Sequence, residues 1–303
     1  MLDPRQLQAL DAVVETQSFE RASRRLNLTQ SAVSQRVRGL ESQLGQPLVM
    51  RSSPISATAA GASVLRYYRQ TRALHDALLD QLSTSAQGGP TRLAIAVNAD
   101  SLASWLLQGF DRLFKRHTVS LDLFVDDQDR TIAMLREGKV VGSISSHDRA
   151  LQSCDCVPLG IMRYIPAASP AFCRKYFDAG MTKEAMRRAP AIEFNSKDEL
   201  QRIYLSSRFG LDRNEYAYHQ VPSSEAFLQF LLRGHGWGMV PEIQGRAALQ
   251  RGRLIPLDGG RDYLDVPLYW HVWNISTPLV RALTKALQEQ AAIDLHPGRS
   301  ESA

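Results

Sequence analysis

Several features are scarce or absent in this sequence of 303 residues, and each scarcity excludes a class of protein. No apolar run approaches the ~20 residues that a membrane-spanning helix needs. The first residues, MLDPRQL, lack the charged start and apolar core of a secretion signal. The three cysteines, Cys154, Cys156 and Cys173, are an odd number in a long chain, which favours free thiols in a reducing, cytoplasmic setting. The sequence therefore argues against a membrane protein and against a disulfide-stabilised secreted protein.

Motifs for catalysis or metal binding are also missing. The seven histidines are scattered without an HxxxH or HExxH pattern, and no nucleophile elbow is present. Cys154-Asp155-Cys156 has no second thiol pair to complete a metal site. Gly234-His-Gly-Trp-Gly238 lacks the lysine of a phosphate-binding loop, so we interpret it as a tight turn. We expect no catalytic residues, no metal and no cofactor.

Lysine is absent from the first 90 residues, although that segment is the more basic part of the chain. It holds ten arginines and seven acids, whereas residues 91–303 hold 26 basic and 24 acidic side chains, giving a total net charge of +5. Between Arg21 and Arg51 six arginines accompany one acid, Glu41. Arginine presents a planar fork that matches phosphate and guanine, so this region favours contact with nucleic acid.

Residues 18–44, SFERASRRLNLTQSAVSQRVRGLESQL, have the pattern of a helix-turn-helix. Val33, Val37 and Leu40 follow helical spacing in the second helix, and the two helices meet at a polar break capped by Ser18 and Thr29. A helix over 6–16 supplies a third wall for a small core. Amide, hydroxyl and guanidinium groups on the second helix suit base edges and phosphate. The candidate DNA contacts from this helix are Thr29, Gln30, Ser31, Ser34, Gln35, Arg36 and Arg38. An ordinary helical bundle with a solvated basic face would show the same periodicity.

The segment after this motif predicts a wing and a long helix. Residues 45–51 and the polar loop after them predict a short β-hairpin, or wing, that could place Arg51 against the DNA backbone or in the minor groove. A helix over 58–85 carries a heptad seam, which would pair it with a second copy of the chain. Packing on its own C-terminal domain is the alternative. The seam consists of Gly61, Leu65, Tyr68, Arg72, His75, Leu79 and Leu82, and a rival seam of Val64, Thr71, Leu74 and Leu78.

Beyond a linker at 87–90, strands alternate with helices, which predicts a mainly parallel sheet in a two-lobed domain. The first unit has strands at 92–97, 119–125 and 141–145 and helices at 102–116 and 130–137. The second unit covers about 164–259. A strand at 267–273 and a helix at 279–292 follow, and the tail from Asp294 is expected to be disordered.

Polar residues that follow the strands are candidates for binding a small molecule. Ligands of open α/β sheets bind at the carboxyl ends of strands, and helix starts there favour a carboxylate while acids hold an ammonium or guanidinium. That combination suits an amino acid, especially a basic one, although each residue could equally be a helix cap. The candidates are Asn98, Asp100, Ser101, Asp127, Ser145, Asn195, Ser223, Ser224 and Glu225.

Two sets of motifs resemble a known family over nearly the whole chain. SFERASRRLNLTQSAVSQRVRGLESQLGQPLVMR, followed by Thr58-Ala-Ala-Gly61, is similar to the signature of LysR-type transcriptional regulators. The C-terminal half resembles the branch that controls arginine and lysine export, in the segments LAIAVNADSLASWLL, VGSIS, SSEAFLQF and LYWH. The resemblance implies that the helix from Thr29 enters the major groove of operator DNA. It further implies lysine or arginine as coeffector and an adjacent exporter gene as target.

The expected architecture is an N-terminal all-α winged helix-turn-helix joined to a two-lobed α/β domain like periplasmic binding proteins. We divide the chain into a DNA-binding domain (1–58), a dimerisation helix (59–86), lobe 1 (91–163 with 269–293), lobe 2 (164–268) and a tail (294–303). Expected partners are operator DNA, the effector, a second copy or a dimer of dimers, and potentially RNA polymerase. The alternatives are a regulator that senses a neutral amino acid, an organic acid or thiol oxidation, and a solute-binding protein.

Overall fold

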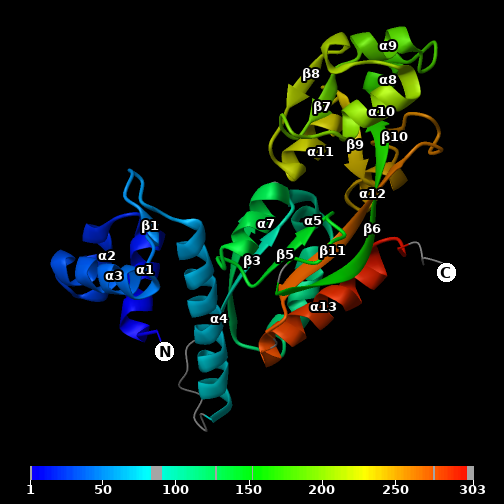
Figure 1. Cartoon of the computed structure of the whole chain (residues 1–303). Helices are drawn as coiled ribbons and strands as arrows, with labels where there is room; N and C mark the ends of the chain where they lie inside the picture. The colour runs from blue at the N-terminus through cyan, green and yellow to red at the C-terminus, as the bar shows by residue number, and fades with distance from the viewer. Residues whose placement is uncertain (1, 83–90, 127, 152, 276, 299–303) are drawn as a thin grey trace.

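The N-terminal unit is built from three helices and a short hairpin (Figure 1). The computed structural model describes residues 2–82, 91–126, 128–151, 153–275 and 277–298. The helices are α1 (Pro4–Thr16), α2 (Phe19–Leu26) and α3 (Gln30–Leu44). The Ser18 side chain accepts a hydrogen bond from the Arg21 N–H, and the Thr29 side chain accepts from the Ala32 N–H. The two predicted caps and the helix-turn-helix are therefore confirmed.

The predicted core of this unit is also confirmed. Val33, Val37 and Leu40 are fully buried against α1 and α2. The wing is an antiparallel pair of β1 (Val49–Met50) and β2 (Ser56–Ala57). Gly61 fits beside the wing because a Cβ there would lie 2.0 Å from the carbonyl oxygen of Leu48.

Helix α4 (Ala59–Leu82) joins the two halves of the molecule. The first part of the predicted seam packs within the chain, because Leu65 is 2% exposed and belongs to the core of the helix-turn-helix. The exposed apolar stripe is instead Tyr67, Leu74 and Leu78. The two predicted seams therefore lie on different faces: Leu65 of the first packs within the chain, whereas Leu74 and Leu78 of the rival seam are exposed. The end of the helix expected at 83–85 lies outside the described residues.

The C-terminal half is organised by one nine-stranded sheet among the described residues. Its main path runs β4 (Val119–Val125), β3 (Thr91–Val97), β5 (Gly142–Ser145), β11 (Leu264–Trp273), β6 (Cys154–Ala168), β9 (Trp237–Pro241), β7 (Ala191–Glu193) and β8 (Tyr218–Gln220), while β10 (Ile255–Pro256) pairs with β6. The long strands β6 and β11 run side by side between two α/β units (Figure 1). The prediction of a mainly parallel sheet was wrong for this connection, since β11 is antiparallel to β5 and β6, and β6 is antiparallel to β9.

We call the two units lobe 1 and lobe 2. Lobe 1 holds β3–β5 with α5 (Ala99–Ser104), α6 (Leu106–Phe114), α7 (Gln128–Arg136) and α13 (Pro278–Asp294). Lobe 2 holds β7–β9 with α8 (Pro170–Tyr176), α9 (Lys183–Arg188), α10 (Leu200–Phe209), α11 (Ser224–Leu232) and α12 (Glu242–Gln250). The pairing of β6 with β11 shifts register between Leu268 and Tyr269, so Leu159 of β6 has no Cα partner there.

Two predictions about elements need correction. The helix expected over 102–116 is divided into α5 and α6 at Trp105, whose side chain is fully buried together with that of Leu106. The tail expected to be disordered from Asp294 is ordered as far as it is described. His296 forms a β-bridge with Ile161 and its ring contacts the Glu242 carboxylate at 2.9 Å.

Candidate DNA-binding and effector sites

The outer face of α3 carries most of the predicted DNA contacts. Thr29, Gln30, Ser31, Gln35 and Arg38 are exposed there, and Ser34 is half-buried between them. At 100° per residue, the members of this set within the helix, from Gln30 to Arg38, span about 140° of its surface, and Thr29 precedes the helix as its N-cap. Arg36 lies about 100° beyond Gln35, at the border of the buried face, and is only partly exposed. The helix register therefore separates Arg36 from the other candidates and favours Arg38.

Arg51 is fixed at the start of the wing. Its Nη2 lies 3.5 Å from a Glu41 carboxylate oxygen, and its guanidinium lies 5.9 Å from the ring centre of Phe19. The other Glu41 oxygen accepts the N–H groups of Leu48 and Val49 at 2.9 and 3.4 Å. Glu41, the one acid in the basic segment, thus orients the wing.

Asp100 connects the two lobes directly. It lies in α5 of lobe 1, and one of its carboxylate oxygens accepts a hydrogen bond of 2.6 Å from the Ser224 hydroxyl at the start of α11. The other oxygen accepts one of 2.8 Å from the Tyr164 hydroxyl on β6. Ser224 is also 3.1 Å from the Gln244 side-chain oxygen on α12. Asp100 and Ser224 were predicted from the sequence; Tyr164 and Gln244 were not.

Buried polar atoms without partners lie next to Asp100. Asn98 Oδ1 and Ser101 Oγ are buried and have no hydrogen-bond partner within the described part of the chain. Parallel pairing sets Ala96 opposite Ser143, which brings the buried Ser145 toward Asn98 at the same sheet edge. The Ser145 hydroxyl accepts the N–H of His147 at 3.2 Å. Asn98 and Ser101 therefore offer unused polar groups where lobe 1 meets lobe 2.

Carboxyl groups gather around Asp100. Burial raises the pKa of Asp100, against hydrogen bonds from Ser224 and Tyr164 that lower it, and the charge of Glu225 raises it further. Burial also raises the pKa of Asp198, whose carboxylate accepts the N–H groups of Phe194 and Leu200, and the charge of Asp100 adds to that rise. The sequence reasoning missed Asp198, although it follows β7 by five residues, where an acid could have been sought. Electrostatically, this junction suits a cation.

The remaining candidates are less directly involved. Ser223 caps α11 and its hydroxyl lies 3.2 Å from Glu225. Asn195 uses its side-chain oxygen to accept the Lys197 N–H at 2.8 Å, which is a local turn contact. Asp127 lies outside the described residues.

The three thiols are poorly suited to redox sensing. Burial raises the pKa of Cys154, Cys156 and Cys173, so the reactive thiolate is disfavoured at each. Cys156 Sγ lies 4.0 Å from Nε2 of the buried His271. No group of three or more metal-ligating side chains occurs in the residues that the structure describes.

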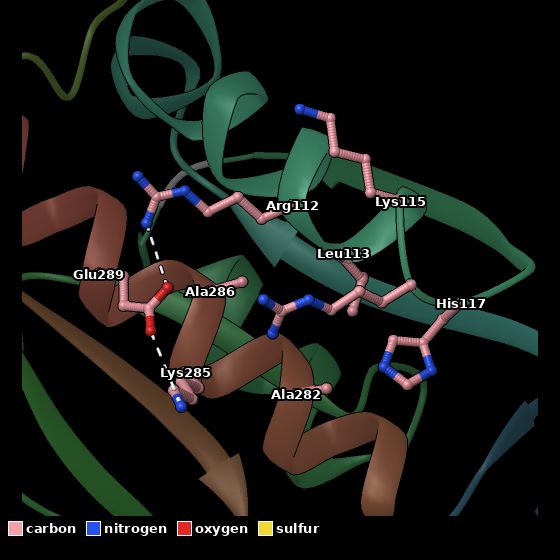
Figure 2. A pocket seen from close by; sticks show the side chains of 9 residues that line it. Arg112, Leu113, Lys115, His117, Ala282, Lys285, Ala286 and Glu289 are labelled. Carbon is pink, nitrogen blue, oxygen red and sulfur yellow. Dashed lines mark hydrogen bonds and ion pairs between the residues drawn. The ribbon is translucent and has the colours of Figure 1, made fainter.

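A basic cavity of about 200 Å³ lies between α6 and α13, on lobe 1 (Figure 2). Its lining includes the cationic side chains of Arg112, Lys115, Arg116 and Lys285. Glu289, the acid of the lining, contacts Arg112 at 3.1 Å and Lys285 at 3.9 Å. The excess positive charge makes this cavity unsuitable for a cationic ligand, in contrast to the junction at Asp100.

A winged helix-turn-helix joined through a long helix to a two-lobed α/β domain defines a DNA-binding transcription regulator with an effector-binding domain. Residues 4–62 match the bacterial regulatory helix-turn-helix proteins of the lysR family, and residues 86–292 match the LysR substrate binding domain. The chain belongs to the LysR family. This is a family of regulators rather than of enzymes. No helix in the described part of the chain has the length and apolar character to cross a membrane.

Relatives cover nearly the whole chain. The HTH-type transcriptional regulator ArgP of Aeromonas salmonicida is 40% identical over 98% of this chain and 99% of its own. The crystal structure of ArgP from Mycobacterium tuberculosis is 38% identical, with a TM-score of 0.89 over 99% of this chain and 100% of that one. Full-length LysG from Corynebacterium glutamicum with bound effector Arg is 33% identical, with a TM-score of 0.82 over 97% of this chain and 100% of that one.

Proposed function

We propose that this regulator senses a basic amino acid, lysine or arginine, at the junction around Asp100. The observation that carries the proposal is the gathering of Asp100, Asp198 and Glu225, in which the charge of Glu225 raises the pKa of Asp100 and the charge of Asp100 raises the pKa of Asp198. A ligand ammonium or guanidinium would neutralise these carboxylates. Asn98 and Ser101 would supply polar contacts to the rest of the ligand. The bound arginine of the related LysG supports this choice.

The ligand would act by changing the contact between the lobes. In the structure, Asp100 is satisfied by Ser224 of lobe 2 and Tyr164 of the connecting strand. A cation that takes over this carboxylate competes with the Ser224 contact and so favours a different lobe arrangement. It can shift that equilibrium only by its difference in affinity for the two arrangements.

Isothermal titration of the full chain with lysine and with arginine tests the site. Asp100→Asn removes a carboxylate while keeping its size, and we expect it to weaken binding at least about tenfold, or about 1.4 kcal/mol. Glu289→Gln, in the basic cavity, is the matched control and should bind as the wild type does. Wild-type binding that survives Asp100→Asn unchanged, or a response only to a neutral amino acid or organic acid, would reject the proposal.

The remaining parts of the proposal concern DNA, oligomer and target. We place the operator contacts on α3, with Arg51 at the wing, and the dimer contact on the exposed Tyr67, Leu74 and Leu78 stripe of α4. Two copies would then read two half-sites of operator DNA in the cytoplasm, as a dimer or a dimer of dimers. An amino acid exporter gene is the proposed target, with RNA polymerase as a further partner. Operator selection from a genomic fragment library tests the target.

A further inference from the structure

Arg69, near the middle of α4, joins the DNA-binding unit to lobe 1. Its Nε and Nη2 atoms donate to one oxygen of Asp11 at 2.8 and 2.7 Å. Asp11 lies on α1, and the side chains of Arg69 and Asp11 are only 11% and 7% exposed. Because an unpaired buried charge is costly, the guanidinium and α1 are expected to move together.

The same guanidinium also reaches the effector-binding domain. Nη1 of Arg69 donates to the backbone oxygen of Glu137 at 3.2 Å, in the turn that follows α7. The next residue, Gly138, has a φ of +70°, and a Cβ added to it would lie 2.9 Å from Cα of Arg66. This turn is therefore seated directly against the backbone of α4.

Open space lies beside this contact. A cavity of about 260 Å³ lies between α4 and the end of α7, with Arg66, Arg136 and Glu137 among its lining residues. Helix α7 packs on β3 and β5, the two strands whose ends hold Asn98 and Ser145. A displacement at those strand ends can therefore reach the Glu137–Gly138 turn through one packed helix.

We propose that Arg69 is a positioning residue that couples lobe 1 to the DNA-binding unit. It holds Asp11 of α1 and the Glu137 carbonyl with one planar group, so that movement of α7 alters the orientation of the helix-turn-helix. Arginine is required because its fork spans two acceptors, whereas a lysine ammonium is a compact point charge that can keep Asp11 but release Glu137. This inference deepens the proposed function, whose ligand would drive the movement.

The deciding experiment needs no amino acid ligand. Hydrogen exchange of backbone amides 136–139 is measured in the full chain with and without a DNA duplex at low salt, because coupling between two sites is reciprocal. The variants are Arg69→Lys and Gly138→Ala. Gly252→Ala is the matched control, because Gly252 has a φ of +65° and open space where the Cβ would lie.

We expect DNA to slow exchange of these amides at least about threefold in the wild type and in Gly252→Ala. This DNA-linked change in exchange should disappear in Arg69→Lys and Gly138→Ala. The DNA affinity of both variants should stay within about threefold of the wild type. A merely structural role for Arg69 would not produce this combination of results. Equal DNA-linked changes in all four proteins, or none in the wild type, would overturn the inference. A separate lysine and arginine titration that leaves wild-type operator affinity unchanged rejects the proposed effectors, and the exchange result still decides the role of Arg69.

Discussion

Single side chains on α3 divide into those that face solvent and those that border the core. Arg38 is exposed beside Gln30 and Ser34, whereas Arg36 lies near the buried face. The spacing of Val33 and Val37 in the sequence already sets Arg38 away from the buried face, and the observed helix has that register. Arg36 is a candidate only through the resemblance to the family.

Arg38→Ala is expected to weaken operator binding by roughly 1–3 kcal/mol if the side chain reads a base, measured by fluorescence anisotropy at fixed salt. Arg36→Ala serves as its control and should cost less than half as much. An equal loss from both variants would contradict the assignment of the contact face.

The raised pKa of Asp100 gives stability a defined pH dependence. A carboxyl whose pKa is higher in the folded state binds its proton more tightly there, so its contribution to stability is lost as pH rises through the folded pKa. As pH falls from neutral toward that value, the wild type should gain stability relative to Asp100→Asn in urea unfolding. The pKa of Glu215 is lowered by a backbone hydrogen bond from Asp212 and by the Arg187 side chain. A comparison of the wild type with Glu215→Gln should therefore show the opposite trend.

At the scale of elements, helix α4 has two apolar faces. One face completes the core of the helix-turn-helix through Leu65, and the opposite face exposes Tyr67, Leu74 and Leu78. The sequence showed two competing seams because both faces carry apolar side chains at helical spacing. A single heptad pattern could not separate them.

Leu74→Glu with Leu78→Glu should raise the dissociation constant of the dimer at least about tenfold, because a buried charge would be unpaired at the interface. Sedimentation velocity across a concentration series measures this. Asp76→Lys changes the charge on the opposite side of the helix and should leave the dimer intact. A double variant that stays dimeric at all concentrations would place the interface elsewhere.

The elements that the sequence predicted well are those encoded by local signals. Ser18 and Thr29 cap their helices, and the spacing of Val33 and Val37 defines the buried face, so the helix-turn-helix could be predicted within a few residues. The antiparallel course of β6 and β11 depends on pairing between residues about 100 positions apart. Tyr164 reaches Asp100 only through that topology, and single-sequence patterns contain no signal for it.

At the scale of the whole molecule, one sheet connects both lobes and Asp100 bridges them. A ligand bound by the folded chain alone stabilises it by RT ln(1 + [L]/Kd), or about 2.7 kcal/mol at a hundredfold excess over Kd. Lysine or arginine should therefore raise the temperature of the unfolding transition of the full chain, measured by differential scanning calorimetry. Asp100→Asn should reduce the shift, to about half for a tenfold weaker Kd, while an undiminished shift in this variant would point to another binding site.

The paired strands β6 and β11 have a mechanical consequence. Two strands that hydrogen-bond over ten residues form a ribbon that resists stretching and bending in its plane, but a ribbon twists easily where its ladder is interrupted. The interruption here lies at Leu159, between the two lobes. A ligand bound at the junction would thus favour a rotation of one lobe relative to the other about the axis of the ribbon.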